Sequence, residues 1–406
     1  MHKSRKKNIA TIRFSQICGY SRMVNDIATQ QGEQPVVTLK DVANKAGVSM
    51  STASAAIRGK DIVKPETTQR VLEAANRLSY RTNLSARALR SGKSDIFTMI
   101  VPDLETQYYA KLANSMAKAL ASEQKRLIVQ ISQYDKDKER ELVRQITPST
   151  CDGVFICSTQ SSGADIHAVA GSIPVLMFDD MSNDIEAYYD SIETPSQTGM
   201  YAIIKHLVEC GRRKIGIVGT TTSNIRKISL STTLRQNRCI YAYQAMQSYG
   251  LDTPKAYIQS DWGVGAGIQI AHDLVRQGMC YDALCCMNDE LALGVLRGLA
   301  ECGVHVPDDV AVTGFDGVLT GSYTMPTLST VAVDFNSMAR TAVAMMQDQI
   351  ERDDADHVES MPRHVIVGFQ LLKRESTLGR NISTASINKN PSAKTSADRT
   401  STTKEA

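Results

Sequence analysis

Several features that would indicate a secreted, membrane or metal-binding protein are missing from this chain of 406 residues. Its nine cysteines are scattered, and their spacing matches neither a zinc site nor a disulfide framework. No apolar run is long enough to cross a bilayer, and the basic start of the chain is not followed by the apolar core of a signal peptide. These absences predict a cytoplasmic protein with no membrane partner and no bound metal.

Motifs of the common enzyme classes are missing as well. The sequence contains no Gly-x-Ser-x-Gly elbow, no phosphate-binding Walker loop and no His-Glu-x-x-His zinc motif. The glycine-rich segment 263–267 lacks the spacing that a dinucleotide-binding turn needs. We therefore predict that the chain is not an enzyme and holds no cofactor.

Charge is distributed unevenly along the chain. Residues 1–94 contain 17 Lys and Arg against 6 Asp and Glu, whereas the remaining residues contain 29 against 37. A basic amino-terminal part joined to an acidic remainder indicates that the first part binds a polyanion and that the rest does not.

The pattern of apolar residues divides the chain into segments. Residues 1–36 are predicted to form a flexible basic arm. Residues 378–406 are predicted to form a disordered tail, because residues 376–406 include twelve Ser or Thr and no aromatic residue. Between about 95 and 374, short apolar runs alternate with amphipathic helical stretches, and this alternation predicts parallel sheets covered by helices on both faces. The runs lie at 96–101, 127–131, 153–157, 175–178, 215–218, 283–287 and 310–314.

Residues 38–80 show helical patterns only. Thr38 and Asp41 match a capping box that opens a first helix, Gly47 suits the left-handed turn that ends it, and Ser49 can cap a second helix. The predicted inward residues are Leu39, Val42, Ala43 and Ala46 in the first helix, Ala53, Ala56 and Ile57 in the second, and Val71, Leu72, Ala75 and Leu78 in a third that begins near Pro65. The predicted outward residues of the second helix are Met50, Ser51, Ser54, Ala55 and Arg58.

Two helices joined by a turn that contains glycine form a helix-turn-helix, whose second helix enters the major groove of DNA. Spacing alone leaves open a three-helix packing unit without a ligand, and the surplus of Lys and Arg favours DNA binding.

Residues 37–94 resemble the lactose-repressor/galactose-repressor family of transcription regulators. The matching residues are Thr38-Leu39-Lys40-Asp41-Val42-Ala43, Ala46-Gly47-Val48-Ser49, Ser51-Thr52-Ala53-Ser54, Pro65-Glu66-Thr67 and Val71-Leu72-Glu73-Ala74-Ala75. The resemblance implies a DNA-binding domain at 37–82 in which Met50, Ser51 and Ala55 contact bases, Thr52 and Ser54 contact phosphates, and Thr38, Ser49 and Arg58 also bind DNA. Ala55 stands where members commonly carry Arg, so it cannot pair with guanine, although its methyl can touch thymine.

Residues 83–93 resemble the hinge helix of the same family. In members, two hinge helices of a dimer fold on the DNA and wedge a Leu into the minor groove, and Leu89 matches that Leu. Asn83 and Arg87 are further expected DNA contacts in this segment. A short cationic helix is marginally stable alone, so a solvated linker is the alternative interpretation.

Residues 94–377 resemble the periplasmic-binding-protein-like core of the family. The matching stretches are Ile100-Val101-Pro102-Asp103-Leu104, Lys205-His206-Leu207, Gly211-Arg212-Arg213-Lys214-Ile215, Met287-Asn288-Asp289, Pro307-Asp308-Asp309-Val310-Ala311-Val312-Thr313-Gly314-Phe315-Asp316, Pro326-Thr327-Leu328-Ser329-Thr330-Val331 and Arg374-Glu375-Ser376-Thr377. The implied fold is an all-α helix-turn-helix head followed by an α/β core of two doubly wound parallel-sheet subdomains. We expect an N-subdomain at about 94–192 and 331–361, and a C-subdomain at about 193–330 and 362–377.

Effectors of this fold bind in a cleft between the subdomains, beyond the carboxyl ends of strands. The resemblance implies that the effector site contains Tyr108, Tyr109, Asp179, Arg238, Trp262, Asn288 and Asp316. Asp316 can accept hydrogen bonds from hydroxyl groups, while Arg238 and Asn288 can donate them. The alternative is that the two tyrosines are surface residues and that Trp262 belongs to the core. Many members have Asn-Pro-Phe-Phe where this chain has Thr106-Gln107-Tyr108-Tyr109.

The expected function is that of a cytoplasmic homodimeric regulator that binds a double-stranded DNA operator. We expect a repressor whose operator affinity is controlled by a small-molecule effector, which in this family is most often a sugar; a purine or nucleoside is the second effector class. A global regulator controlled by a partner protein is one alternative. A solute-binding protein is another, and both the helix-turn-helix and the missing signal peptide count against it.

Overall fold

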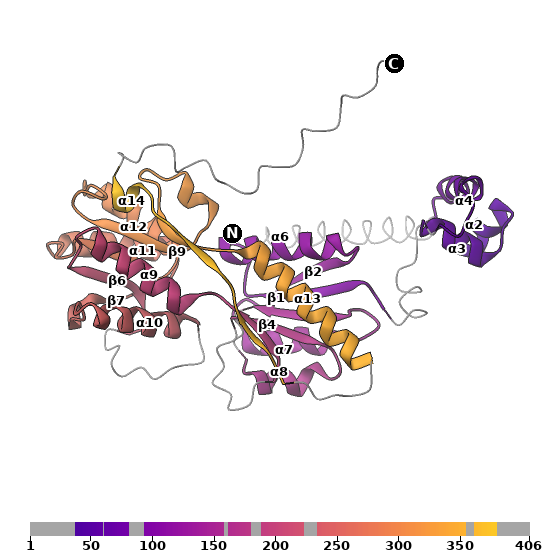
Figure 1. Ribbon diagram of the computed structural model, residues 1–406, viewed down its shortest axis with the longest axis horizontal. Coiled ribbons are helices and arrows are strands. Elements are labelled where there is room, and N and C mark those ends of the chain that lie inside the picture. Colours follow the sequence, from indigo (N-terminus) through magenta and orange to yellow (C-terminus); the bar gives the residue numbers. More distant parts are fainter. Residues whose placement is uncertain are drawn as a thin grey trace, which may run out of the picture. The chain divides into compact units, whose positions relative to one another are not determined.

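The computed structural model describes residues 37–59, 61–80, 93–157, 161–179, 188–222, 234–354 and 361–379. The contacts divide the chain into two units, with the division next to residue 87. We call residues 37–80 the head and residues 93–379 the body, and each is described by itself (Figure 1). The predicted arm lies outside the described residues, as do the predicted hinge apart from Lys93 and the predicted tail apart from Leu378 and Gly379.

The head contains three helices, α2 (Leu39–Ala46), α3 (Met50–Ile57) and α4 (Pro65–Arg77). The predicted capping box is confirmed, since Thr38 and Asp41 exchange hydrogen bonds at the start of α2. Gly47 has a φ of 65° and ends α2 in the left-handed conformation, and the Ser49 hydroxyl accepts from the Thr52 N–H at the start of α3. The helices pack around Val42, Ala43, Ala53, Ala56, Val71 and Ala74.

One inward residue of the head was predicted wrongly. Leu72 is exposed on α4, and Ala74 is buried in the head core instead. Three short helices leave little room next to Val71, so the small Ala74 side chain fits against the neighbouring helices where a second large one would not.

The body contains two six-stranded sheets, one in each subdomain. The N-subdomain sheet has the order β11-β5-β4-β3-β1-β2, with β1 (Ile96–Val101), β2 (Arg126–Ile131), β3 (Gly153–Cys157), β4 (Val175–Phe178), β5 (Asp190–Glu193) and β11 (His364–Ile366). The C-subdomain sheet has the order β12-β10-β9-β8-β6-β7, with β6 (Ile215–Thr220), β7 (Tyr257–Gln259), β8 (Ala283–Cys286), β9 (Ala311–Asp316), β10 (Ser329–Val333) and β12 (Phe369–Leu372). Neighbouring strands are parallel except β10 and β12.

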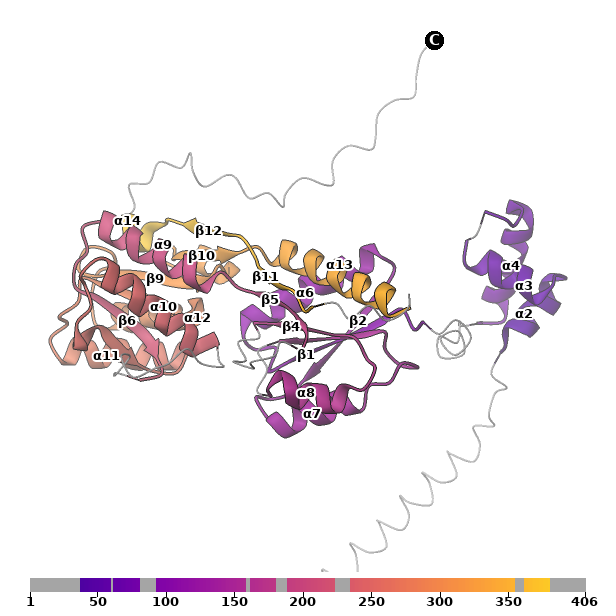
Figure 2. The same cartoon turned by 60° about the horizontal axis from the view of Figure 1, so that its bottom comes forward.

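Helices cover both faces of the sheets, as the alternating pattern predicts. In the N-subdomain, α6 (Gln107–Ser122) packs beside α13 (Phe335–Asp354) on one face, and α7 (Lys136–Arg144) packs beside α8 (Gly163–Ala170) on the other (Figures 1 and 2). In the C-subdomain, α9 (Ser196–Glu209) packs beside α10 (Leu234–Ser248), and α11 (Val264–Arg276) packs beside α12 (Asp289–Glu301). The last described helix is α14 (Glu375–Leu378). Among these described helices, none has the length and apolar composition of a membrane span.

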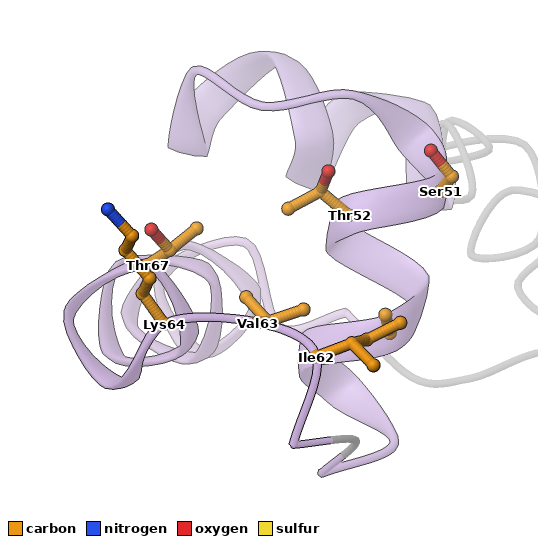
Figure 3. Close-up of a pocket in the computed structure, with 7 residues that line it drawn as sticks. Ser51, Thr52, Ile62, Val63, Lys64 and Thr67 are labelled. Atoms are coloured by element: carbon orange, nitrogen blue, oxygen red, sulfur yellow. The ribbon is translucent and has the colours of Figure 1, made fainter.

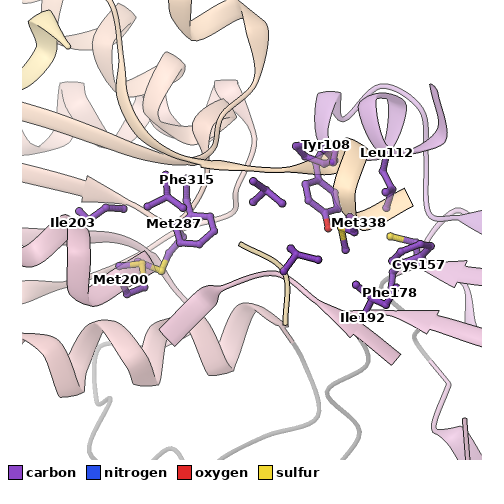
Figure 4. Packing of buried hydrophobic residues seen from close by; sticks show 14 of the residues in the cluster. Tyr108, Leu112, Cys157, Phe178, Ile192, Met200, Ile203, Met287, Phe315 and Met338 are labelled. Carbon is purple, nitrogen blue, oxygen red and sulfur yellow. The ribbon is translucent and has the colours of Figure 1, made fainter. Parts of the chain in front are cut away.

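The chain passes between the subdomains after β5, after β10 and after β11. We expected the chain to pass between the subdomains near residues 331 and 362, and both passages occur slightly later. The first is later because β10 continues to Val333 in the C-subdomain sheet. The second is later because β11 still pairs with β5 in the N-subdomain sheet. One buried apolar cluster includes residues of both subdomains, such as Tyr108 and Phe178 from one and Met287 and Phe315 from the other (Figure 4).

Hydrogen bonds also connect the two subdomains at the first turns of α6. The Gln107 N–H donates to Glu290 Oε1 at 2.8 Å, and its side-chain Oε1 accepts from the Thr320 hydroxyl at 2.5 Å. The Lys111 ammonium donates to the Gly317 carbonyl oxygen at 2.7 Å. We call these five residues the subdomain bridge. Gln107 supplies the N–H whose hydrogen bond Glu290 accepts, which a Pro at this position could not do.

Glycine allows α11 and α12 to approach each other closely. A Cβ added to Gly294 on α12 would overlap the carbonyl oxygen of Val264, and one added to Gly267 on α11 would overlap that of Leu291. Both obstacles are backbone atoms, so no side-chain rotation can relieve them.

We expect Gly294→Ala to lower the free energy of unfolding by about 3 kcal/mol, because the added methyl forces the two helices apart. Gly265→Ala is the matched control, since Gly265 is exposed on α11 and an added Cβ meets no atom within 4 Å. Urea titration of the full chain measures both variants. Equal stability of the two would contradict the close packing of α11 and α12.

We expect Gln107→Pro to loosen the subdomain bridge, because Pro suits the first turn of a helix but removes the N–H and the side chain that the C-subdomain contacts. Spin labels on α7 and α11 of the protein without added ligand would show a longer or broader distance distribution. Lys118→Ala, an exposed position later in α6, is the control. An unchanged distribution in Gln107→Pro would mean that the bridge does not hold the subdomains together.

Candidate functional site

The head carries a helix-turn-helix whose second helix, α3, has an exposed first turn. Met50 is 47% exposed, and Ser51 and Arg58 are exposed as well, as predicted for DNA contacts. Thr52 and Ser54 are half-buried. Thr38 and Ser49 are exposed and also serve as helix caps, so their hydroxyl groups are hydrogen-bonded within the head. Asn83, Arg87 and Leu89, the expected contacts in the hinge, lie outside the described residues.

Ala55 was predicted to point outward, and this prediction is wrong. The residue is 5% exposed in the structure. It lines a hollow of about 350 Å³ together with Ile62 and Val63, which belong to the segment between α3 and α4. Because that segment folds back against α3, it covers a helix position that the helical repeat alone places on the outer face.

The hollow has an apolar and a polar part. Figure 3 shows Thr52 on α3 facing the first turn of α4 with Thr67 and the segment with Val63 and Lys64, while Ser51 and Ile62 also line the hollow. Val63 packs against the head core, whereas Ile62 is 82% exposed. Sequence analysis missed Ile62, Lys64 and Thr67 as candidate DNA contacts. These three residues lie just before and after Pro65, which fixes the start of α4. This closeness to a helix start is the sequence signal that could have indicated them.

Three of the predicted effector-site residues meet around a buried guanidinium in the C-subdomain. Arg238 lies on α10, and its side chain is 1% exposed. Its Nη1 donates to the Met287 carbonyl oxygen at 2.6 Å and lies 3.4 Å from Asp316 Oδ1. The guanidinium carbon is 3.9 Å from the centre of the Phe315 ring and 5.2 Å from that of the Trp262 indole. These contacts hold the cation in place between two aromatic rings.

One nitrogen of this guanidinium makes no hydrogen bond to the described residues. Arg238 Nη2 is buried and has no hydrogen-bond partner among the residues that the structure describes. Buried donors in proteins are nearly always hydrogen-bonded, so an unpaired one suggests a bound molecule or water. Burial raises the pKa of Asp316 well above its usual range, and the neighbouring Arg238 opposes that shift.

Two other predicted residues meet in the N-subdomain. The buried Tyr108 hydroxyl donates to Asp179 Oδ2 at 2.6 Å, and Asp179 Oδ1 accepts from the N–H and hydroxyl of Thr194. Burial, followed by the charge of Asp179, raises the pKa of Tyr108 well above its usual value. The hydroxyl of Tyr108, which the resemblance places in the effector site, is therefore already hydrogen-bonded within the N-subdomain. Tyr109 is half-buried and packs edge to face on Tyr108.

The two groups of residues lie near each other. The negative charge of Asp179 contributes to the raised pKa of Asp316, and the charge of Asp316 contributes to that of Tyr108. Asp179 follows β4 and Asp316 ends β9, so each aspartate stands at the carboxyl end of a parallel strand. Their φ angles of 51° and 113° are strained for residues with a side chain, as is common at binding sites.

Asn288 and Trp262 also lie near the carboxyl ends of C-subdomain strands. Asn288 follows β8 and caps α12, where its Oδ1 accepts from the Leu291 N–H at 3.0 Å. Trp262 follows β7 and donates from Nε1 to the Gly219 carbonyl oxygen at 2.7 Å. Trp262 as a whole is half-buried. Sequence analysis missed the supporting residues Ser196 and Thr194, which contact Arg238 and Asp179.

Two family models match the chain. Residues 38–83 match the bacterial regulatory proteins of the lacI family, and residues 204–377 match the periplasmic binding protein-like domain. The chain is 26% identical over 323 residues to catabolite control protein A of Priestia megaterium, covering 79% of this chain and 94% of that protein. It is 29% identical over 323 residues to the HTH-type transcriptional repressor PurR of Haemophilus influenzae, covering 79% and 93%.

Solved structures share the fold. A putative LacI-family regulator of Sanguibacter keddieii superposes with a TM-score of 0.60 at 27% identity, covering 70% of this chain and 98% of that chain. The lac repressor dimer bound to operator and the anti-inducer ONPF superposes with a TM-score of 0.70 at 22% identity, covering 84% and 99%. The family models, the relatives and the observed head and body all indicate the same family. The chain belongs to the lacI family of bacterial transcription regulators.

Proposed function

We propose that this chain is a homodimeric transcriptional repressor of the cytoplasm that binds a pseudo-palindromic DNA operator through its head and a carbohydrate effector through its body. The operator part rests on the α2–α3 helix-turn-helix with Met50, Ser51 and Arg58 exposed on α3. The effector part rests on one observation, the buried Arg238 guanidinium whose Nη2 has no partner among the described residues. We infer that the body binds a ligand and does no catalysis.

A polyhydroxylated ligand suits the groups that meet around Arg238. Asp316 accepts hydrogen bonds and Arg238 donates them, which is the pairing that a vicinal diol needs. Trp262, which is half-buried next to Arg238, is of the residue type that packs on the apolar face of a sugar. Two structures of the same fold fit this class: the regulator CelR in a complex with cellobiose, and a LacI-family regulator of Enterococcus faecium with bound ribose.

Operator binding should depend steeply on salt. Residues 37–94 contain eleven Lys and Arg against four Asp and Glu, so binding releases counterions from the phosphates. If a dimer contacts about six phosphates, the affinity falls by about a thousandfold between 50 and 200 mM salt. Fluorescence anisotropy with an operator selected from random DNA measures this dependence. A flat salt dependence, or a footprint over a single half-site, would contradict the proposal.

Asp316→Asn should leave operator binding unchanged and abolish the response to the effector. Asn keeps the shape of the side chain but loses a charged acceptor, which weakens sugar binding by about 10- to 100-fold. Asp316→Ala should also lower the free energy of unfolding by about 3 kcal/mol, because it leaves the buried Arg238 without its counter-charge.

The response is measured by titrating a panel of mono- and disaccharides, including ribose and cellobiose, into the operator complex. Asp308→Asn, an exposed position in the same subdomain, is the control and should respond like the wild type. If Asp316→Asn responds to the same sugar at the wild-type concentration, Asp316 does not bind the effector.

A further inference from the structure

The most exposed large apolar side chain of the described head lies at the edge of the hollow beside α3. Ile62 is 82% exposed, compared with 47% for Met50 and 44% for Leu72. Ile62 and Ala55 both line the hollow, and Ala55 itself is covered. The methyl group of Ala55 is therefore covered, and the exposed apolar side chain that lines the hollow is Ile62, which lies on the segment between α3 and α4.

The surroundings of Ile62 indicate what covers it. Polar groups border the hollow on α3 and α4, namely the hydroxyls of Ser51, Thr52 and Thr67 and the ammonium of Lys64 (Figure 3). The basic surplus of residues 37–94 attracts a polyanion. Charge complementarity and the position next to the exposed turn of α3 both favour DNA as the occupant.

Among the base edges in the major groove, thymine alone presents a methyl group. An exposed Ile next to hydroxyl groups matches such a methyl better than it matches the donor and acceptor edges of guanine or adenine. Lys64 is the single cationic side chain that lines the hollow, and its amine suits a phosphate as well as it suits guanine.

We propose that Ile62 is a specificity-determining residue that packs on the C5-methyl group of a thymine in each operator half-site, at the hollow beside α3. This proposal rests on the proposed function of the head as an operator-binding domain. Ile62 takes the place of a bidentate Arg–guanine contact, which Ala55 cannot make. The preferred base at this position is thymine, recognised by its methyl group.

Replacing single thymines of the operator by uracil tests the proposal, because uracil lacks only the methyl group. The operator is selected from random duplex DNA with the full chain, and affinities are measured at one salt concentration. We expect uracil at one symmetric position to weaken binding about fourfold per half-site, as for the loss of one buried methyl group. A 5-methylcytosine pair at that position should bind better than a cytosine pair.

Two variants assign the effect to the residue. Ile62→Ser should lower affinity for the thymine operator about as much as uracil does, and uracil should then cause no further loss. Leu72→Ser is the matched control, since Leu72 is an exposed aliphatic side chain of the head that does not line the hollow, and it should keep the full uracil effect. Circular dichroism checks that both variants retain the helical content of the wild type.

Several outcomes would overturn the proposal while operator binding stands. These are an operator in which no uracil substitution matters, a uracil effect that persists in Ile62→Ser, and an invariant guanine whose preference is lost in Lys64→Ala. If the chain selects no DNA at all, the proposed function itself fails, and the proposal fails with it.

Discussion

The need to neutralise one buried cation organises the C-subdomain. Arg238 is almost completely removed from water, so its charge requires Asp316 and the Met287 carbonyl oxygen, and its flat faces require the rings of Phe315 and Trp262. Arg238 lies on α10, whereas its partners come from the end of β9 and from the segments that follow β7 and β8. A single guanidinium thus fixes the relative positions of several strand ends, and its unpaired Nη2 is what remains for a ligand.

The same region carries the contacts between the subdomains. Asp179 follows β4 and Asp316 ends β9, both in strained conformations. The subdomain bridge joins α6 to Glu290, Gly317 and Thr320. Gly317 directly follows Asp316, and Glu290 lies two residues after Asn288. A ligand that moves Asp316 or Asn288 would therefore also displace the bridge. This proximity offers a physical route from effector binding to subdomain movement.

The head illustrates how a short connecting segment changes a helix surface. The helical repeat places Ala55 among the outward residues of α3, but the segment before Pro65 folds back and covers it. The same segment exposes Ile62, an apolar side chain at a hollow that polar residues also line. The surface of the head at this position is therefore formed by two segments together, and not by α3 alone.

The sequence by itself determined the helix-turn-helix, its caps and the alternation of strands and helices, because capping, turns and apolar runs are local properties. The runs at 96–101, 153–157 and 175–178 coincide with β1, β3 and β4. β5, β7, β10, β11 and β12 went unpredicted, because these strands of three to five residues are too short, or contain too many polar residues, to form an apolar run. Resemblance named Arg238, Asp316, Tyr108 and Asp179, but only the tertiary structure decided that they pair as they do, that Ala55 is covered, and that Gln107 meets Glu290. Those contacts join residues up to 183 positions apart, and no local preference of the chain encodes them.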